Sequence, residues 1–146
     1  MMRAGAAIVQ AGGAGVFIDN SLLAHGGRDW LAMTDDGSPD AISFAFTSII
    51  RGKEDVWTAG MQVMGLPDLL MRRADLDEDG DAIIEIIRYV CGGEKPVGVG
   101  HIFADEQGPR FQIVATTQDD FDAQSPMHNP FGRLRIESLK GLAEFN

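Results

Sequence analysis

The residues with the clearest chemical potential form a run of alternating acids near the middle of the chain. Asp75, Asp77 and Asp79 occupy alternate positions, and Gly80 follows them directly. This is the first half of a calcium-binding loop, in which the carboxylates bind the ion and the glycine allows a sharp turn. A complete loop closes with a bidentate Glu at its twelfth position, which is Ile86 here. The acids are therefore interpreted as the negatively charged start of a helix, and weak divalent-cation binding by the three aspartates remains an alternative.

Histidine is the other residue type that suits acid–base chemistry near neutral pH, and the chain contains three. His101 is at the start of a predicted strand and close in sequence to Asp105 and Glu106, so a His–carboxylate pair there would serve as general acid and base. His128 is the second candidate, because two prolines fix the loop 124–132 that presents it. A hydrogen-bonded or solvated histidine is the simpler interpretation of both positions, and no catalytic residue is assigned.

The composition limits the partners and the compartment of the protein. Its 146 residues are 45% hydrophobic and carry a net charge of −10, so the chain can bury a core while its surface repels nucleic acid and anionic lipid. Neither nucleic acid nor a membrane is expected as a partner. The single cysteine, Cys91, excludes an intrachain disulfide and lies on an apolar helix face, which indicates a buried thiol. The small apolar residues from Met1 to Gly15 are interpreted as a helix of the mature fold, which gives a cytoplasmic protein.

The glycine-rich stretches do not indicate a nucleotide cofactor. Gly12-Gly13-Ala14-Gly15 follows a predicted helix and precedes a strand, whereas phosphate-binding loops run from strand to glycines to helix. Gly98-Val99-Gly100 lacks the third glycine of the dinucleotide motif, because position 103 is Phe. Both stretches are interpreted as turns, and no cofactor is expected.

Hydrophobic periodicity predicts one α+β domain over residues 1–146, with a mostly antiparallel sheet. The main helix is expected at about 77–91, where apolar residues recur every three or four positions until two glycines stop it. A second helix near the N-terminus, at 3–11, is expected to pack with it on one face of the sheet. Strands are predicted at 16–19, 22–25, 43–50, 56–64, 69–72, 101–104, 110–116 and 134–138. The expected core contains Phe44, Phe46, Trp57, Met61, Val63, Ile83, Ile87 and Val90.

Several segments carry a resemblance to a known family. The stretch 57–69 reads WTAGMQVMGLPDL and leads into the acidic helix, after which 97–101 reads VGVGH. Together with 15–18 and 22–25, these segments resemble the uncharacterised family called domain of unknown function 4261, over residues 4 to 116 approximately. The chain resembles the C-terminal part of the longer family members. The resemblance implies an α+β fold and assigns no activity and no catalytic residue.

These observations favour a non-catalytic interaction or ligand-binding module, because no motif in the sequence assembles a catalytic constellation. A small hydrolase or isomerase that uses a His–carboxylate pair is the first alternative, and a weak cation-binding domain is the second. The partner is expected to be a protein or a small molecule of unknown identity. A homodimer is one way to cover a sheet edge or an apolar face that the chain leaves exposed.

Overall fold

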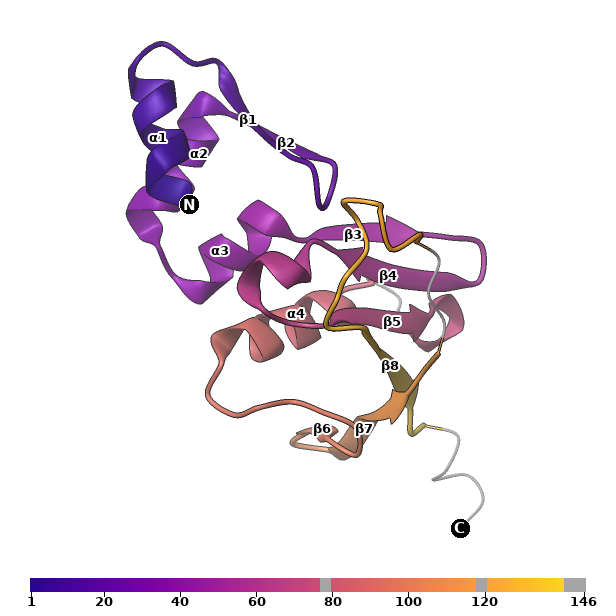
Figure 1. Ribbon diagram of the computed structural model, residues 1–146. Helices are drawn as coiled ribbons and strands as arrows, with labels where there is room; N and C mark the ends of the chain where they lie inside the picture. Colours follow the sequence, from indigo (N-terminus) through magenta and orange to yellow (C-terminus); the bar gives the residue numbers. More distant parts are fainter. Residues whose placement is uncertain (77–79, 118–120, 141–146) are drawn as a thin grey trace.

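The computed structural model describes residues 1–76, 80–117 and 121–140, and a six-stranded sheet dominates it (Figure 1). The strands lie in the order β3–β4–β5–β8–β7–β6. Neighbouring strands are antiparallel except β5 and β8, which are parallel. The strands are β3 (Ser48–Arg51), β4 (Asp55–Ala59), β5 (Asp68–Arg72), β6 (Ile102–Asp105), β7 (Gly108–Ala115) and β8 (Arg133–Ser138). The predicted α+β class with a mostly antiparallel sheet is confirmed.

The main helix, α4 (Ala82–Gly92), covers one face of this sheet and buries its apolar stripe there. Ile83 is completely buried, and Ile87 is 5% exposed. The core beneath the helix contains Val56, Leu69, Met71, Phe111, Ile113 and Ile136, which come from the four central strands. Burial of each such side chain contributes about 1.5–3 kcal/mol. Within the described residues the helix begins at Ala82, later than the expected 77, and Gly93 ends it in a left-handed conformation (φ 69°).

The first 46 residues form a smaller unit at one end of the sheet (Figure 1). Its elements are α1 (Met2–Gln10), β1 (Gly15–Ile18), β2 (Leu23–Gly26), α2 (Gly27–Asp36) and α3 (Pro39–Phe46). Trp30 lies at the centre of this unit, where its indole N–H donates to the carbonyl oxygen of Met2 (3.0 Å) and its ring meets Phe46 edge-on. α1 packs mainly on α2 and β1. It therefore does not share the sheet face with α4, which corrects the expected position of the N-terminal helix.

The segment 43–50 is not the single strand that its alternation predicts, because its first part is helical and only β3 is extended. Ser38 caps the helix α3, because its hydroxyl oxygen accepts from the N–H of Ala41 (3.2 Å), and Pro39 occupies the first turn. The change of element turns Phe44 outward, where it is 71% exposed, while Phe46 is 3% exposed. The prediction that Phe44 belongs to the core is therefore wrong.

The predicted strand 56–64 also ends early, because the chain turns at Gly60. Gly60 has a φ of 101°, and a Cβ at this position would collide with the carbonyl oxygen of Phe46. A short 3₁₀ helix, η1 (Met61–Met64), follows and leads to β5. Met61 is completely buried as expected, and the turn brings its N–H to Asp68 at the start of β5.

Candidate functional site

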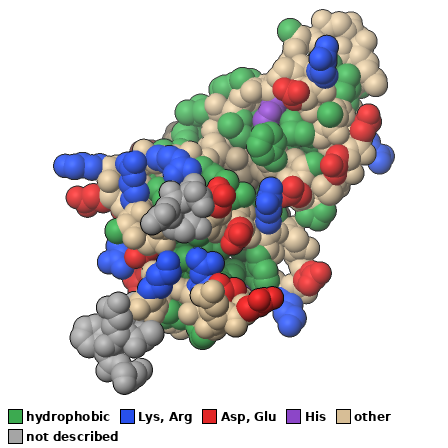
Figure 2. Space-filling model, turned by 180° about the vertical axis from the view of Figure 1, so that it is seen from behind, with side chains coloured by type: hydrophobic (Ala, Val, Ile, Leu, Met, Phe, Trp, Pro, Cys, Tyr) green, Lys and Arg blue, Asp and Glu red, His purple; other side chains and the backbone are tan. Residues whose placement is uncertain are grey.

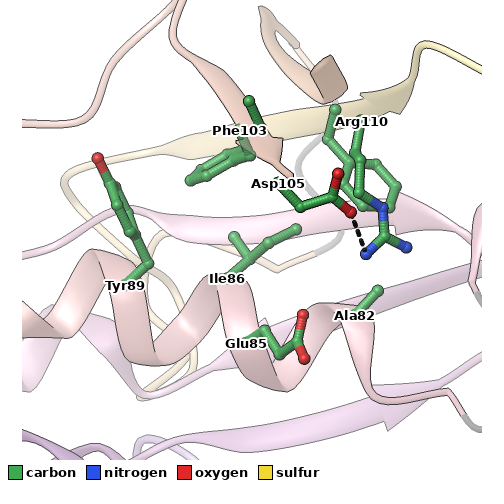
Figure 3. Close-up of a pocket in the computed structure, with 9 residues that line it drawn as sticks. Ala82, Glu85, Ile86, Tyr89, Phe103, Asp105 and Arg110 are labelled. Carbon is green, nitrogen blue, oxygen red and sulfur yellow. Dashed lines mark ion pairs between the residues drawn. The ribbon is translucent and has the colours of Figure 1, made fainter. Parts of the chain in front are cut away.

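A groove lies between α4 and the hairpin of β6 and β7, with a cavity volume of about 180 Å³. Figure 3 shows side chains of the helix on one side and side chains of the hairpin on the other. The helix contributes Ala82, Glu85, Ile86 and Tyr89, and the hairpin contributes Phe103, Ala104, Asp105, Arg110 and Phe111. A helix and the hairpin that follows it in the chain thus form one concave surface.

The groove has an aromatic end. The ring of Tyr89 meets Phe103 edge-on, with centroids 5.3 Å apart. His101 joins this cluster, because its ring lies 4.9 Å from that of Phe103 and 5.5 Å from that of Tyr89. Tyr89 is 49% exposed, so a large aromatic surface remains in contact with solvent at the mouth of the groove. Aromatic faces of this kind bind apolar and cationic side chains well.

The opposite end of the groove is charged. Arg110 and Asp105 form an ion pair with a distance of 3.4 Å from Nη1 to Oδ2, and their side chains are 30% and 39% exposed. The guanidinium of Arg110 also lies 5.4 Å from the centre of the Phe111 ring. Glu85 points toward this end from α4 (Figure 3). Two carboxylates and one guanidinium therefore leave the groove with a local excess of negative charge.

The groove runs along an edge of the sheet. In the described part of the chain β6 is the last strand in the order and pairs with β7 on one side. Ile102 is 49% exposed on this strand, and Ala104 and Asp105 are exposed as well. An edge strand presents unpaired backbone N–H and C=O groups that can bind another extended segment. The strand is short and carries a bulge between Phe103 and Ala104, which limits uncontrolled pairing.

Within the part of the chain that the structure describes, His101 and Asp105 do not form the His–carboxylate pair that the sequence suggested. His101 packs its ring into the aromatic cluster, whereas Asp105 binds Arg110. Four residues of extended chain separate their Cα atoms by about 13 Å. His128 lies in another region, in the loop 124–132, where its carbonyl oxygen accepts from Gln62 Nε2 (3.4 Å). The two histidine candidates thus belong to different sites.

The acidic run is only partly described. Asp75 binds Arg72 through two contacts, of 3.1 Å to Nε and 3.3 Å to Nη2. The candidate ligands Asp77 and Asp79 lie outside the described residues. Among the residues that the structure describes, no group of three or more His, Cys, Asp or Glu side chains could hold a metal ion. The ion pair gives Asp75 a role at the end of β5.

A buried carboxylate that the sequence analysis missed, Asp68, lies at the start of β5 and is 2% exposed. Its Oδ1 accepts from Thr58 Oγ1 (2.9 Å) and from the N–H of Met61 (3.4 Å), and its Oδ2 accepts from Asn129 Nδ2 (2.9 Å). Burial raises the pKa of Asp68, although these hydrogen bonds and the charge of Arg133 act in the opposite direction. The carboxylate therefore joins η1, β4 and the loop 124–132 at one point.

Asn129 makes this connection possible from the loop. Its amide also donates to the carbonyl oxygen of Leu66 (2.9 Å), and its side-chain oxygen accepts from the N–H of Phe131 (2.9 Å). The sequence contained one indication of the network, since an acid at position 68 heads the apolar run Leu69-Leu70-Met71. A small cavity of about 180 Å³ adjoins it, lined by Asp68, Thr116, Thr117, Phe121, Met127, Asn129, Gly132 and Arg133. The donors already saturate most of the carboxylate, so we interpret Asp68 as an anchor for the loop.

Fold and site together describe an α+β protein with a helix-flanked groove at the edge of its sheet. Comparisons of the chain with protein-family models, with curated proteins and with solved structures find no match. The resemblance to domain of unknown function 4261 therefore stays a prediction. Among the described helices, none combines the length and the apolar character that crossing a bilayer requires.

Proposed function

We propose that this protein is a non-catalytic interaction module that binds an extended peptide segment of a partner protein. The segment adds to β6 as a further antiparallel or parallel strand and inserts an apolar side chain between α4 and the hairpin. The observation that carries the proposal is the position of the groove, which lies between a helix and an edge strand. Peptide recognition by strand addition uses this combination, with backbone hydrogen bonds for affinity and a pocket for specificity.

The size of the groove supports a side chain as its occupant. Pockets that enclose a whole small molecule usually have volumes of about 300–1,000 Å³. The groove has about 180 Å³, which suits one apolar or aromatic side chain. Tyr89, Phe103 and Ile86 would then contact this anchor on three sides.

The charge of the groove supports a basic peptide. Glu85 and Asp105 outweigh Arg110 at its polar end, and the whole chain has a net charge of −10. This field attracts Lys and Arg residues beside the anchor and increases the association rate of a basic partner. The same charge disfavours nucleic acid.

Selection from a phage-displayed library of random peptides tests the proposal. We expect the selected peptides to carry one apolar anchor next to Lys or Arg, and to shift the NMR amide signals of β6 and α4. Tyr89→Ala should weaken their binding about tenfold, as the loss of an aromatic contact surface typically does. Phe44→Ala is the matched control, because Phe44 is also an exposed aromatic residue but lies on α3. Peptides that bind Tyr89→Ala as tightly as the unchanged protein would refute the proposal.

A cytoplasmic location and a homodimer complete the proposal. Cys91 is a free thiol in the described structure, which is compatible with a reducing compartment. Phe17 and Leu22 on the β1–β2 hairpin are each 59% exposed, and a second copy would cover them. Light scattering at micromolar concentration checks the second point, since a monomer there would exclude a stable dimer.

A further inference from the structure

A second, larger cavity lies on the face of the sheet that points away from α4, beside the turn between β3 and β4. Its volume is about 530 Å³, which falls in the range of small-molecule sites. It is lined by Lys53, Glu54, Asp55, Arg72, Arg73, Ala74 and Arg135. Four of these seven residues are cations and two are acids, in a chain whose net charge is −10. Asp75 and Glu137 form ion pairs with Arg72 and Arg135. The cations of the lining without an ion-pair partner among the described residues are therefore Lys53 and Arg73.

The sheet register brings three of these side chains to one face. Asp55 pairs with Arg72, and Leu70 pairs with Arg135, so Asp55, Arg72 and Arg135 point away from α4. Their neighbours Val56 and Met71 point the other way, into the core beneath the helix. The two guanidinium groups are thus held by adjacent strands of a rigid sheet. Lys53 in the turn and Arg73 after β5 close the cavity at its rim.

The ion pairs inside the cavity leave room for another anion. Arg135 lies 3.8 Å from Asp55 and 3.6 Å from Glu137, distances that exceed those of hydrogen bonds. Asp75 engages Arg72 more closely, at 3.1 Å. A shorter contact to Arg135 is therefore open to an incoming anion.

The remaining two cations have no carboxylate partner within the described residues. Arg73 donates to the carbonyl oxygen of Gly52 (3.3 Å), and Lys53 is exposed. Figure 2 shows Lys and Arg side chains gathered at the end of the molecule that carries the β3–β4 turn. These exposed cations supply the attraction that the paired guanidinium groups lack.

We propose that this cavity binds a small soluble anion with linked phosphate groups, of the pyrophosphate class. Guanidinium groups bind phosphate oxygens through two parallel N–H donors, and Lys adds a mobile point charge. Arg135 and Arg73 would contact different phosphates, while Lys53 neutralises charge at the open side. A ligand in this position would bind the sheet face that points away from α4, outside the peptide groove, so the protein would bind two different partners.

Calorimetric titration with inorganic pyrophosphate, accompanied by amide NMR spectra, tests this proposal. We expect binding that shifts the amide signals of residues 52–55, 72–74 and 135, and that weakens as the salt concentration rises. Arg73→Gln and Lys53→Gln should each weaken binding about tenfold, since each removes one charge-assisted contact. The matched controls are Arg88→Gln, in α4, and Lys95→Gln, in the segment after α4. Both should leave binding unchanged.

Three results would overturn the proposal. Pyrophosphate binding that appears only at millimolar concentrations, and with the same affinity in all four variants, would identify an adventitious ion only. Binding to vesicles that contain phosphorylated lipids, without binding of free pyrophosphate, would assign the cavity to a membrane headgroup. No binding of either probe would remove the site. None of these results affects the peptide selection, because that experiment reports on β6 and α4.

Discussion

Replacement of Asp68 by Asn is the sharpest test of the buried network, because it changes one atom and one charge. The amide side chain keeps an oxygen as the acceptor for Thr58 and Met61, but places an NH₂ group where Oδ2 accepts from Asn129. Two donors then face each other, and a hydrogen bond to a charged acceptor, worth about 1.5–3 kcal/mol, is lost. Relief from burying a charge offsets part of this loss. We therefore expect the free energy of unfolding to fall by about 2 kcal/mol, which lowers the melting temperature of a chain of this size by roughly 6 °C.

The assay is urea unfolding followed by circular dichroism, at several pH values. Burial raises the pKa of Asp68 above its ordinary value of 3.8, so the folded protein binds this proton more tightly than the unfolded chain. The contribution of Asp68 to stability is therefore complete below the unfolded-state pKa and is lost as the pH rises through the folded-state pKa. Because Asn does not titrate, the destabilisation by Asp68→Asn should be larger near about pH 4 than at neutral pH.

Asp19→Asn is the matched control, since Asp19 is exposed at the end of β1 and should have almost no effect on stability. A change of less than about 0.5 kcal/mol for Asp68→Asn would show that the network does not stabilise the fold. A destabilisation that grows with rising pH would show that hydrogen bonding outweighs burial at this carboxylate, and that the direction of its pKa shift is the opposite.

Three further changes test other parts of the fold. Phe46→Ala should cost about 3–5 kcal/mol by cavity formation, whereas Phe44→Ala should cost less than about 0.5 kcal/mol because Phe44 is 71% exposed; equal effects in chemical denaturation would contradict the helix α3. Gly60→Ala should destabilise by more than about 2 kcal/mol, since its φ is 101° and a methyl group meets the Phe46 carbonyl; a melting curve like that of the unchanged protein would exclude this turn. Burial, and secondarily the charge of Asp40, raises the pKa of Cys91 to about 11. Alkylation of the native, half-buried thiol should therefore be slow at pH values near 8 and accelerate toward about pH 11, and rapid reaction near pH 8 would refute the raised pKa.

Much of the element order follows from local pattern. The isoleucine spacing in 83–87 predicts the helix α4, because this spacing puts the apolar side chains on one helix face that can be buried against a sheet. The turn at 105–108 predicts the hairpin of β6 and β7. The prediction for 43–50 fails because the alternate spacing of Phe44 and Phe46 favours a strand, whereas the residues that precede it start a short helix. The cap formed by Ser38 and Pro39 decides between them, and alternation alone takes no account of it.

The candidate sites are harder to predict, because tertiary contacts build them. Asp105 lines the groove, but its partner is Arg110 across the hairpin and not His101. Tyr89 looks like one more residue of an acidic helix until the fold places it opposite Phe103. Asp68 contacts Asn129 only because a loop 61 residues away in sequence returns to the sheet. No local sequence pattern indicates such tertiary contacts.

The parallel pair of β5 and β8 has a consequence for the order of events during synthesis. Residues 68–71 of β5 can pair with residues 133–136 of β8 only after β8 has been synthesised, so the centre of the sheet forms late. The hairpins β3–β4–β5 and β6–β7 join residues that are near in sequence, so they can form while the ribosome is still adding the last strand. Until β8 arrives, the open edge of β5 and the apolar side chains Leu69 and Met71 are available to other chains. We expect slow final closure and a need for protection of the nascent chain during that interval.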